Sequence, residues 1–407
     1  MVSYIDFTPS RRLPPPSGAG PVFLTMNGES RYMDRDAYLE RLGATTDEPA
    51  DLFEHFEQRS FDGRTYHVLT DARHGLERGT VIVEDAETVI RGYPSIPRLL
   101  VLEPGVQSFF DDGATVAIEE KLDGFNVRIA AVGEPLAFTR SGYVCPYTTA
   151  RARKLLSLEA FFDEHPEKTL CAELIGPETP YTTTDYEGVD THDFRVFGVR
   201  DRESGDPLSV ADRRAICETY DFNQPRLFGR APPDAAVETV RDAIDELDAA
   251  GREGVVMKSE AGDAMVKYTT EAQHHDELAY AFSLPFDHGR DFIFSRLLRE
   301  AFQAAEFDED GDRLQERAHD LGESILFPMV DAIRDVDDGE TIGHRHTVRG
   351  DADSIDALFD HLRDQSMTIE VESDRREDGQ RVVEFVKVAE SSRDRIAHYL
   401  EGGTRTE

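Results

Sequence analysis

The amino-acid sequence predicts an α+β protein built from several domains. A chain of 407 residues is long enough for two to four domains that each bury a core of their own. From about Val101 to Thr270, short β-rich runs alternate with a few helices, whereas the residues that follow show helical periodicity. Near its end the chain again mixes helices and strands. We therefore expect a β-rich central domain, preceded by a small N-terminal domain and followed by a helical module and a C-terminal α/β domain.

The expected N-terminal domain comprises residues 1–100. Its segment Arg11–Pro21 is rich in proline and glycine, a composition typical of a flexible, extended tether. A helix is predicted over Asp36–Leu42, and short strands are predicted over Thr80–Val83 and Thr88–Ile90. Because these elements are few and short, the domain should be small.

Changes in periodicity set the other expected boundaries. The central domain spans residues 101–272 and includes a predicted helix over Asp234–Ala250. The helical module spans residues 273–340, and the α/β domain spans residues 341–407. The elements predicted in these last two parts are helices over Asp291–Ala305, Asp312–Asp335, Ser354–Arg363 and Arg393–Leu400, and strands over Thr368–Val371 and Val382–Val388.

The amino-acid composition indicates the cellular environment in which the protein works. The net charge is −37, from 82 acidic and 45 basic residues, and only six of the basic residues are lysines. An acid-rich, lysine-poor chain suggests a halophilic cytoplasm, where a Debye length of roughly 3 Å at about 1 M salt would let nucleic acid bind despite this charge. No apolar run approaches the ~18 residues of a membrane span. We expect a cytoplasmic protein with no membrane partner.

Cysteine and histidine do not predict a zinc site. The three cysteines are spaced neither as paired zinc ligands nor as a disulfide framework. The histidine pairs His274 with His275 and His344 with His346 lack a third ligand nearby in the sequence, and such pairs are commonly surface residues. We expect buried cysteines and exposed histidines.

The segment AIEEKLDGFNVRIAAV is the first that indicates a chemical function. The pattern predicts an apolar strand, a turn at Leu122–Phe125 and a second strand. Lys121 therefore lies immediately before the turn. A lysine amine attacks phosphorus only when it is neutral, and its ordinary pKa of ~10.4 must be lowered by neighbouring cations. Lys258 in EGVVMK and Lys267 in MVKY lie in apolar β-like stretches and would supply that charge.

The scarcity of lysine strengthens this interpretation. Three of the six lysines of the chain fall in these short segments, although arginine is used almost everywhere else. A guanidinium stays protonated and cannot be a nucleophile, and a compact ammonium suits a single phosphate oxygen. Any one of these lysines alone would ordinarily be a solvated surface charge. The three together predict a site that handles phosphate.

At this point the sequence resembles the covalent nucleotidyltransferases, a superfamily that comprises DNA ligases, RNA ligases and mRNA capping enzymes. KLDG alone is a weak pattern of four residues. Here it is followed, in the order of the family, by TRSG, AELIG, FRVFGV, EGVVMK and MVKY. Six segments in this order are specific. They imply a nucleotidyltransferase (adenylation) core made of antiparallel sheets with flanking helices.

The resemblance also implies roles for the matching residues. Lys121 resembles the nucleophile that forms a phosphoramidate with AMP, and Glu253 resembles the metal-binding carboxylate, so ATP and Mg²⁺ or Mn²⁺ are the implied cofactors. The implied nucleotide-binding residues are Glu119, Asn126, Arg140, Glu173, Phe197, Lys258 and Lys267. Phe197 resembles the ring stacked on adenine, although by itself it would ordinarily be a core residue. Asn126 could by itself simply end the turn.

The order of the modules favours one branch of the superfamily. DNA ligases and capping enzymes usually continue into a β-rich OB-type domain after the last lysine motif, whereas this chain becomes helical. The sequence is most similar to archaeal homodimeric ATP-dependent RNA ligases that circularise RNA, and AELIGPETPY and FDHGRDFIFSR look like segments of that group. The resemblance implies a homodimer, formed through the helical module of residues 273–340, that joins RNA 5′-phosphate and 3′-hydroxyl ends through a lysyl-AMP intermediate. A DNA ligase, a capping-type enzyme and a non-catalytic binding module stay open as alternatives.

Local charge predicts where RNA would bind. From Lys121 to Lys154 there are six basic residues and two acidic ones. This surplus predicts contacts with RNA phosphates at Arg128, Arg151, Arg153 and Lys154. The alternative is that residues 151–154 form a solvated helix face.

Overall fold

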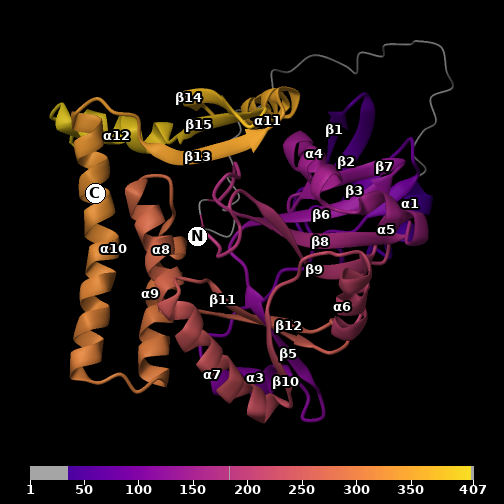
Figure 1. Ribbon diagram of the computed structural model, residues 1–407, viewed down its shortest axis with the longest axis horizontal. Helices are drawn as coiled ribbons and strands as arrows, with labels where there is room; N and C mark the ends of the chain where they lie inside the picture. Colours follow the sequence, from indigo (N-terminus) through magenta and orange to yellow (C-terminus); the bar gives the residue numbers. More distant parts are fainter. Residues whose placement is uncertain (1–34, 183, 405–407) are drawn as a thin grey trace.

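The computed structural model describes residues 35–182 and 184–404. These residues form four antiparallel sheets and the helices that cover them (Figure 1). The predicted tether at Arg11–Pro21 lies outside the described residues. The predicted α+β class is confirmed. The boundaries placed after residues 100, 272 and 340 stay a prediction.

The N-terminal sheet is a meander with strand order β1-β2-β3-β4. Its elements are α1 (Arg35–Leu42), α2 (Pro49–Phe53), β1 (Phe56–Phe61), β2 (Arg64–Leu69), β3 (Val81–Val83) and β4 (Thr88–Ile90). The predicted helix and both predicted strands are present. The sequence analysis missed β1 because its sequence FEQRSF has polar side chains at four of six positions and shows no apolar alternation.

Two central sheets follow, with strand orders β10-β5-β11-β12 and β7-β6-β8-β9. The strands are β5 (Val116–Lys121), β6 (Phe125–Val132), β7 (Glu134–Thr139), β8 (Lys168–Ile175), β9 (Asp193–Asp201), β10 (Leu227–Ala231), β11 (Gly254–Ser259) and β12 (Met265–Thr269). The helices are α3 (Leu102–Phe109), α4 (Pro146–Leu155), α5 (Leu158–Glu164), α6 (Val210–Thr219) and α7 (Pro233–Ala249). The strands on either side of the turn after Lys121 therefore belong to different sheets and do not pair with each other.

Three helices then form the orange part of Figure 1, where α8 packs against both α9 and α10. They are α8 (Glu271–Ser283), α9 (Arg290–Glu306) and α10 (Gly311–Asp337). His274, predicted to be exposed, is instead 2% exposed and binds Glu300 through Nδ1 at 2.5 Å. His346 is also buried, so the surface prediction is wrong for these histidines. The partner of His274 is a carboxylate, whereas His346 packs against the Phe385 ring, and sequence spacing alone does not reveal such partners.

The C-terminal unit, residues 343–400, is a three-stranded sheet of order β13-β15-β14 with two helices. Its elements are β13 (Gly343–Gly350), α11 (Ala352–Asp364), β14 (Ile369–Glu377), β15 (Gln380–Val388) and α12 (Glu390–Leu400). Leu358 of α11 and Phe385 of β15 share a buried core with Val127 of β6. Tyr147 of α4 donates a hydrogen bond from its hydroxyl to the carbonyl of Arg349 at 2.8 Å. The C-terminal unit therefore packs directly against a central sheet.

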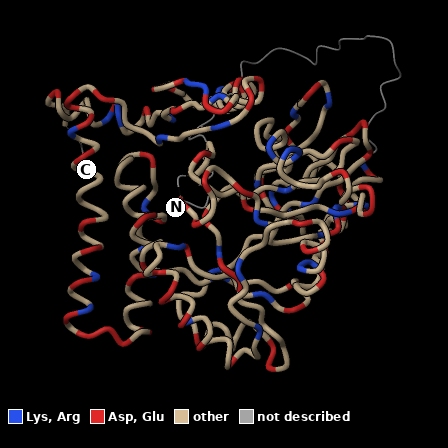
Figure 2. Tube along the Cα trace, in the orientation of Figure 1, with Lys and Arg blue, Asp and Glu red and all other residues tan. Residues whose placement is uncertain are grey.

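Acidic residues occur along the whole trace, on the outer helices as well as on the loops (Figure 2). Among the described helices, none combines the length and the apolar character that crossing a membrane requires. All three cysteines are buried, as expected, and none is in a disulfide.

Candidate active site

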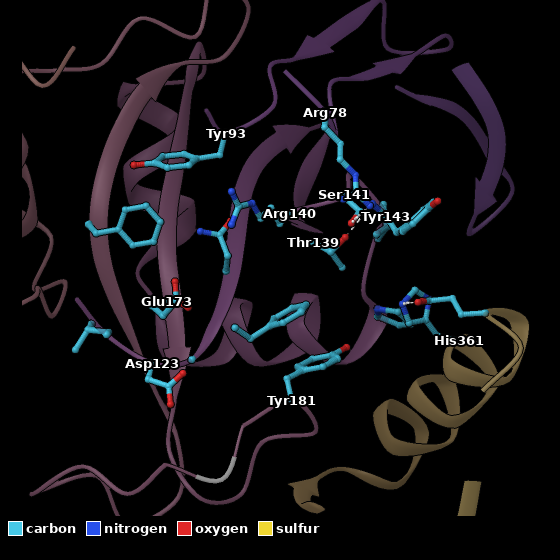
Figure 3. Close-up of a pocket in the computed structure, with 18 of the residues that line it drawn as sticks. Arg78, Tyr93, Asp123, Thr139, Arg140, Ser141, Tyr143, Glu173, Tyr181 and His361 are labelled. Atoms are coloured by element: carbon cyan, nitrogen blue, oxygen red, sulfur yellow. Dashed lines mark hydrogen bonds between the residues drawn. The ribbon is translucent and has the colours of Figure 1, made fainter. Parts of the chain in front are cut away.

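A cavity of about 1060 Å³ lies where the central sheets, the N-terminal sheet and the C-terminal unit meet (Figure 3). It is lined by all nine residues predicted for catalysis, nucleotide binding and metal binding, namely Glu119, Lys121, Asn126, Arg140, Glu173, Phe197, Glu253, Lys258 and Lys267. These residues come from both central sheets and from the loops between their strands. The structure thus brings the sequence-predicted set together in one place.

Lys121 is the last residue of β5, at the junction between the two central sheets. Its Nζ donates a hydrogen bond to Glu253 Oε2 at 2.5 Å. The turn that follows is held tightly, because a Cβ added at Gly124 would lie 2.5 Å from the carbonyl oxygen of Leu174. The backbone N–H of Asp123 donates to the hydroxyl of Tyr186 at 2.6 Å. The position of the amine is therefore fixed by close packing between strands and by side chains distant in the sequence.

Glu253 has the properties of a carboxylate that can bind a cation. It is 2% exposed, and its Oε1 has no hydrogen-bond partner among the described residues. Burial raises the pKa of Glu253, while Lys121 acts in the opposite direction. Glu173 and Asp123 are close enough to Glu253 to influence its environment electrostatically. Several carboxylate oxygens near a phosphate-handling amine suit a hard divalent cation.

Glu119 and Lys258 form a buried ion pair with a distance of 2.8 Å. Glu119 is 1% exposed and also accepts hydrogen bonds from Arg213 and Arg214 of α6. Burial alone would raise the pKa of Glu119, but Lys258 and Arg213 outweigh it and lower the pKa to about 2. Both oxygens of Glu119 are engaged by cations, but Glu119 also lines the cavity, so its contact with a nucleotide stays a prediction.

Lys267 of β12 is a cation in this cavity that no carboxylate of the described residues neutralises by an ion pair. It makes no ion pair and no side-chain hydrogen bond among the contacts of the described residues. Burial, together with charge repulsion from Lys121 and Arg98, lowers the pKa of Lys267 to about 7. Such an amine would gain strongly from a nearby phosphate.

Glu173 and Asn126 are neighbours on paired strands, β8 and β6. Burial raises the pKa of Glu173 to about 8, although Lys121 lowers it. The Asn126 Oδ1 atom is buried and has no hydrogen-bond partner among the described residues. Arg140 lies on the turn after β7 and points into the cavity (Figure 3). This wall therefore offers polar groups with unused hydrogen-bonding capacity.

An aromatic cluster forms the opposite wall. The Phe197 and Tyr93 rings meet edge to face at 5.3 Å, and the Phe197 carbonyl accepts a hydrogen bond from Lys258 at 2.8 Å. Tyr93 and Met265 are buried and in contact, with 3.4 Å between the Tyr93 hydroxyl and the Met265 sulfur. This arrangement can hold a flat apolar ring such as a nucleobase. The sequence analysis did not identify Tyr93, because no motif surrounds it.

The residues predicted to contact RNA are not in this cavity. Arg128 is 1% exposed and donates to backbone carbonyls, including that of Gly79 at 2.7 Å. Arg151 is 5% exposed and binds His192 at 2.6 Å. Neither guanidinium can reach an RNA phosphate, and these two predictions are corrected. Counting charges along the sequence cannot reveal that an arginine is buried to bind carbonyl groups.

Arg153 and Lys154 are exposed at the end of α4. Arg153 is paired with Glu134 at 3.0 Å. At a rise of 1.5 Å per residue, Arg153 lies roughly 10 Å along the helix from Pro146, which borders the cavity. Their contact with RNA stays a prediction.

A second group of possible metal ligands lies between α8 and α9. Atoms of Glu271, His275 and Glu300 lie within 4.8 Å of one another. Arg317 is bound to both carboxylates, at 2.9 and 2.7 Å. This arginine already supplies the positive charge that a metal would bring, so the group is explained as an ion-pair network that joins the helices.

The comparisons with known proteins agree with this site. A family model described as RNA ligase matches residues 114–269, and one described as Ligase Pab1020 C-terminal region matches residues 280–403. Together with the cavity, these matches define the chain as a polynucleotide ligase of the RNA ligase type. An uncharacterized protein of Methanocaldococcus jannaschii is 38% identical over 340 residues, which are 81% of this chain and 85% of that relative.

The solved structures define the family more closely. Two forms of an archaeal ATP-dependent RNA ligase match with a TM-score of 0.85 and 39% identity, over 92% of this chain and 100% of theirs. A protein of Aquifex aeolicus assigned as an ATP-dependent DNA ligase matches with a TM-score of 0.81 and 25% identity, over 88% of this chain and 98% of its own. The chain belongs to the family of archaeal ATP-dependent RNA ligases, as the sequence resemblance implied.

Proposed function

We propose that this enzyme joins RNA 5′-phosphate and 3′-hydroxyl ends by way of AMP bound to Lys121. The observation that carries the proposal is the placement of Lys121 in a cavity with Glu253, two further lysines and an aromatic wall. Its net charge of −37 and its archaeal relatives further suggest that it works in a salt-rich archaeal cytoplasm.

The first step forms a bond between Lys121 Nζ and the α-phosphorus of ATP. The bond from that phosphorus to the bridging oxygen breaks, and pyrophosphate leaves. The proton on Nζ is positioned to pass to Glu253, its hydrogen-bond partner. Lys258, Lys267 and Arg140 line the same cavity and would offset the negative charge that develops on the phosphate.

Two transfers to RNA complete the cycle. An oxygen of the RNA 5′-phosphate displaces Lys121 from AMP, which restores the free amine and activates the RNA end. The RNA 3′-hydroxyl then attacks the activated phosphate, AMP leaves, and the phosphodiester bond is formed. Fixed cations and close positioning supply most of the catalysis in reactions of this kind.

A divalent cation, Mg²⁺ or Mn²⁺, fits the carboxylates near Lys121. Glu253 would hold it through Oε1, which has no hydrogen-bond partner among the described residues, and Asp123 and Glu173 lie nearby. When bound, such an ion neutralises charge on the phosphates.

The deciding experiment measures intact mass after incubation with ATP and a divalent cation in high salt. The wild-type chain should gain one AMP, and Lys121→Ala and Lys121→Arg should gain none. Lys121→Arg is the matched control because it keeps the positive charge but cannot act as a nucleophile. Material stripped of AMP with pyrophosphate is needed so that a preformed adduct is not missed. No adduct in stripped wild-type protein would refute the proposal.

The choice of substrates distinguishes the alternatives. The chain should use ATP and not GTP, and should seal 5′-phosphorylated RNA in preference to DNA of the same sequence. A preference for DNA would make it a DNA ligase, like the assignment of the Aquifex protein. Closed circular RNA, identified by its resistance to exonuclease, would show intramolecular joining.

We also propose a homodimer formed through α9 and α10. These helices carry large apolar side chains that are exposed in a single chain, namely Phe294, Phe302, Leu314, Leu326, Phe327 and Ile333. A second copy of the chain would cover such a surface by symmetry. Light scattering should report a dimer for wild type and a monomer for Phe327→Asp. The control Leu400→Asp, at an exposed apolar position on α12, should stay dimeric.

A further inference from the structure

The cavity extends beyond the residues assigned to ATP. Its far end, opposite Tyr93 in Figure 3, is bordered by Tyr143 and by His361 of α11. Side chains of β1 close this end from the N-terminal sheet. Three separate parts of the chain therefore build a space that the nucleotide-binding set does not use.

The Tyr143 ring is held in a defined position. Its backbone forms a turn with Thr139, through hydrogen bonds from Thr139 N–H to the Tyr143 carbonyl at 2.8 Å and from Tyr143 N–H to Thr139 Oγ1 at 3.2 Å. The turn is pressed against the N-terminal sheet, since a Cβ at Gly142 would lie 2.7 Å from Val68. The guanidinium of Arg59 lies over the Tyr143 ring, 5.0 Å from its centre. Arg140, which points into the nucleotide end, belongs to the same turn.

His361 presents a second ring from the C-terminal unit. Its Nε2 accepts a hydrogen bond from the Gln365 amide at 2.6 Å, which fixes the plane of the imidazole (Figure 3). Burial lowers the pKa of His361 to about 4, while Asp364 raises it and Arg59 lowers it. The imidazole is therefore neutral near pH 7. His361, Tyr143 and Arg59 line the same cavity, and Figure 3 shows Tyr143 and His361 at the same end of it.

The charges at this end disfavour a phosphate. Arg59 is already paired with Glu57 at 2.5 Å. Asp360 and Asp364 of α11 border the same space and outnumber Arg78, which donates to Ser141 at 3.2 Å, and none of the cavity lysines comes from this end. Flat rings without surplus positive charge are suited to bases, because aromatic stacking needs no counter-charge and accepts any base.

We propose that Tyr143 and His361 form a stacking subsite for an unpaired nucleobase of the RNA substrate. The inference rests on the proposed RNA-joining function and adds to it a contact made by the bases near the joined ends. It explains how so acidic a chain can hold RNA, since stacking is far less sensitive to salt than contacts with phosphate. The C-terminal unit thereby becomes part of the RNA site.

The test uses single-stranded RNA with 2-aminopurine near its 5′ end in one set and near its 3′ end in another. Binding without ATP should quench the fluorescence of at least one set as the base stacks. Tyr143→Ala and His361→Ala should each weaken RNA binding by roughly 5- to 150-fold, the equivalent of one lost stacking contact. Tyr143→Phe and His361→Phe keep a ring and should retain the quenching. His398→Ala, an exposed histidine on α12 outside the cavity, is the control.

Adduct formation on the same samples separates this inference from the proposed function. A chain that gains AMP and loses RNA affinity only when a ring is removed supports the subsite. RNA affinity and quenching that are the same in wild type and in both alanine variants would overturn it, even if ligation is confirmed. Equal losses in the alanine and phenylalanine variants would also overturn it, because a stacking role requires the ring alone. Failure of wild type to form the adduct would refute the proposed function instead.

Discussion

Raising the pH should weaken ATP binding through Lys267. Burial lowers the pKa of this amine to about 7, with repulsion from Lys121 and Arg98 acting in the same direction. Below that pH the amine is charged and attracts phosphate, and as the pH rises through it the charge is lost. Bound phosphate would restore the pKa toward its ordinary value of ~10.4. ATP binding above about pH 7 must therefore take up a proton.

The size of the effect follows from the shift. Each pH unit above about 7 costs the free enzyme ~1.4 kcal/mol to recharge Lys267, so the association constant should fall about tenfold per unit. Two units above, the loss is about 100-fold, or ~2.7 kcal/mol. Glu173 titrates in a similar range, because burial raises its pKa to about 8, and its ionisation opposes the nucleotide as well. The two contributions have the same sign and must be separated by substitution.

Calorimetric titration with ATP from about pH 6 to about pH 9 measures this directly. The Lys121→Arg chain should be used, since it keeps the charge that helps to shift Lys267 but cannot form the adduct. Repeating the titration in buffers of different ionisation enthalpy gives the number of protons taken up. Lys267→Met should remove about one proton from that number, and Glu173→Gln should leave the Lys267 contribution in place. The same proton uptake in Lys267→Met and in its parent would refute the argument.

Three further outcomes are expected. Arg213→Leu should lower the free energy of unfolding by about 2 to 4 kcal/mol in denaturant titrations, because Glu119 is buried and loses one of its cations. Gly124→Ala should abolish adduct formation by forcing a Cβ against a backbone carbonyl, whereas Gly113→Ala, with open space around it, should leave the adduct yield unchanged. Removing divalent cations with EDTA should prevent adduct formation and leave the circular dichroism spectrum unchanged.

The active-site residues could be predicted because short local motifs in the sequence identify them. Lys121, Lys258 and Lys267 stand out in a chain that otherwise uses arginine, and each lies in an apolar strand. Their supporting residues could not be predicted in this way. Arg213 and Tyr186 act on Glu119 and Asp123 from 94 and 63 residues away, through contacts that only the folded chain creates.

The errors in the sequence analysis have a related cause. Arg128 and Arg151 look like RNA-binding residues because the sequence shows the charge of a side chain but not its burial. Both residues are buried. Strand β13 was not predicted because GHRHTVRG is polar, yet it pairs with β15 along its full length. Arg128 donates to backbone carbonyls, Arg151 donates to His192, and β13 pairs through its own backbone, and none of these partners is visible in the local sequence.

The junction between the central sheets explains why a motif of four residues can mark this site. β5 and β6 belong to different sheets, so the chain between them must cross from one to the other within three residues. That crossing puts Lys121 at the end of β5 in one sheet and near Glu173 of the other sheet, which is paired with Asn126 close to the start of β6. The crossing also demands glycine at position 124, where the backbone of β8 is in contact. The same turn therefore connects the two sheets and directs the Lys121 amine into the space between them. A substitution that disturbs the sheet connection should also displace the amine.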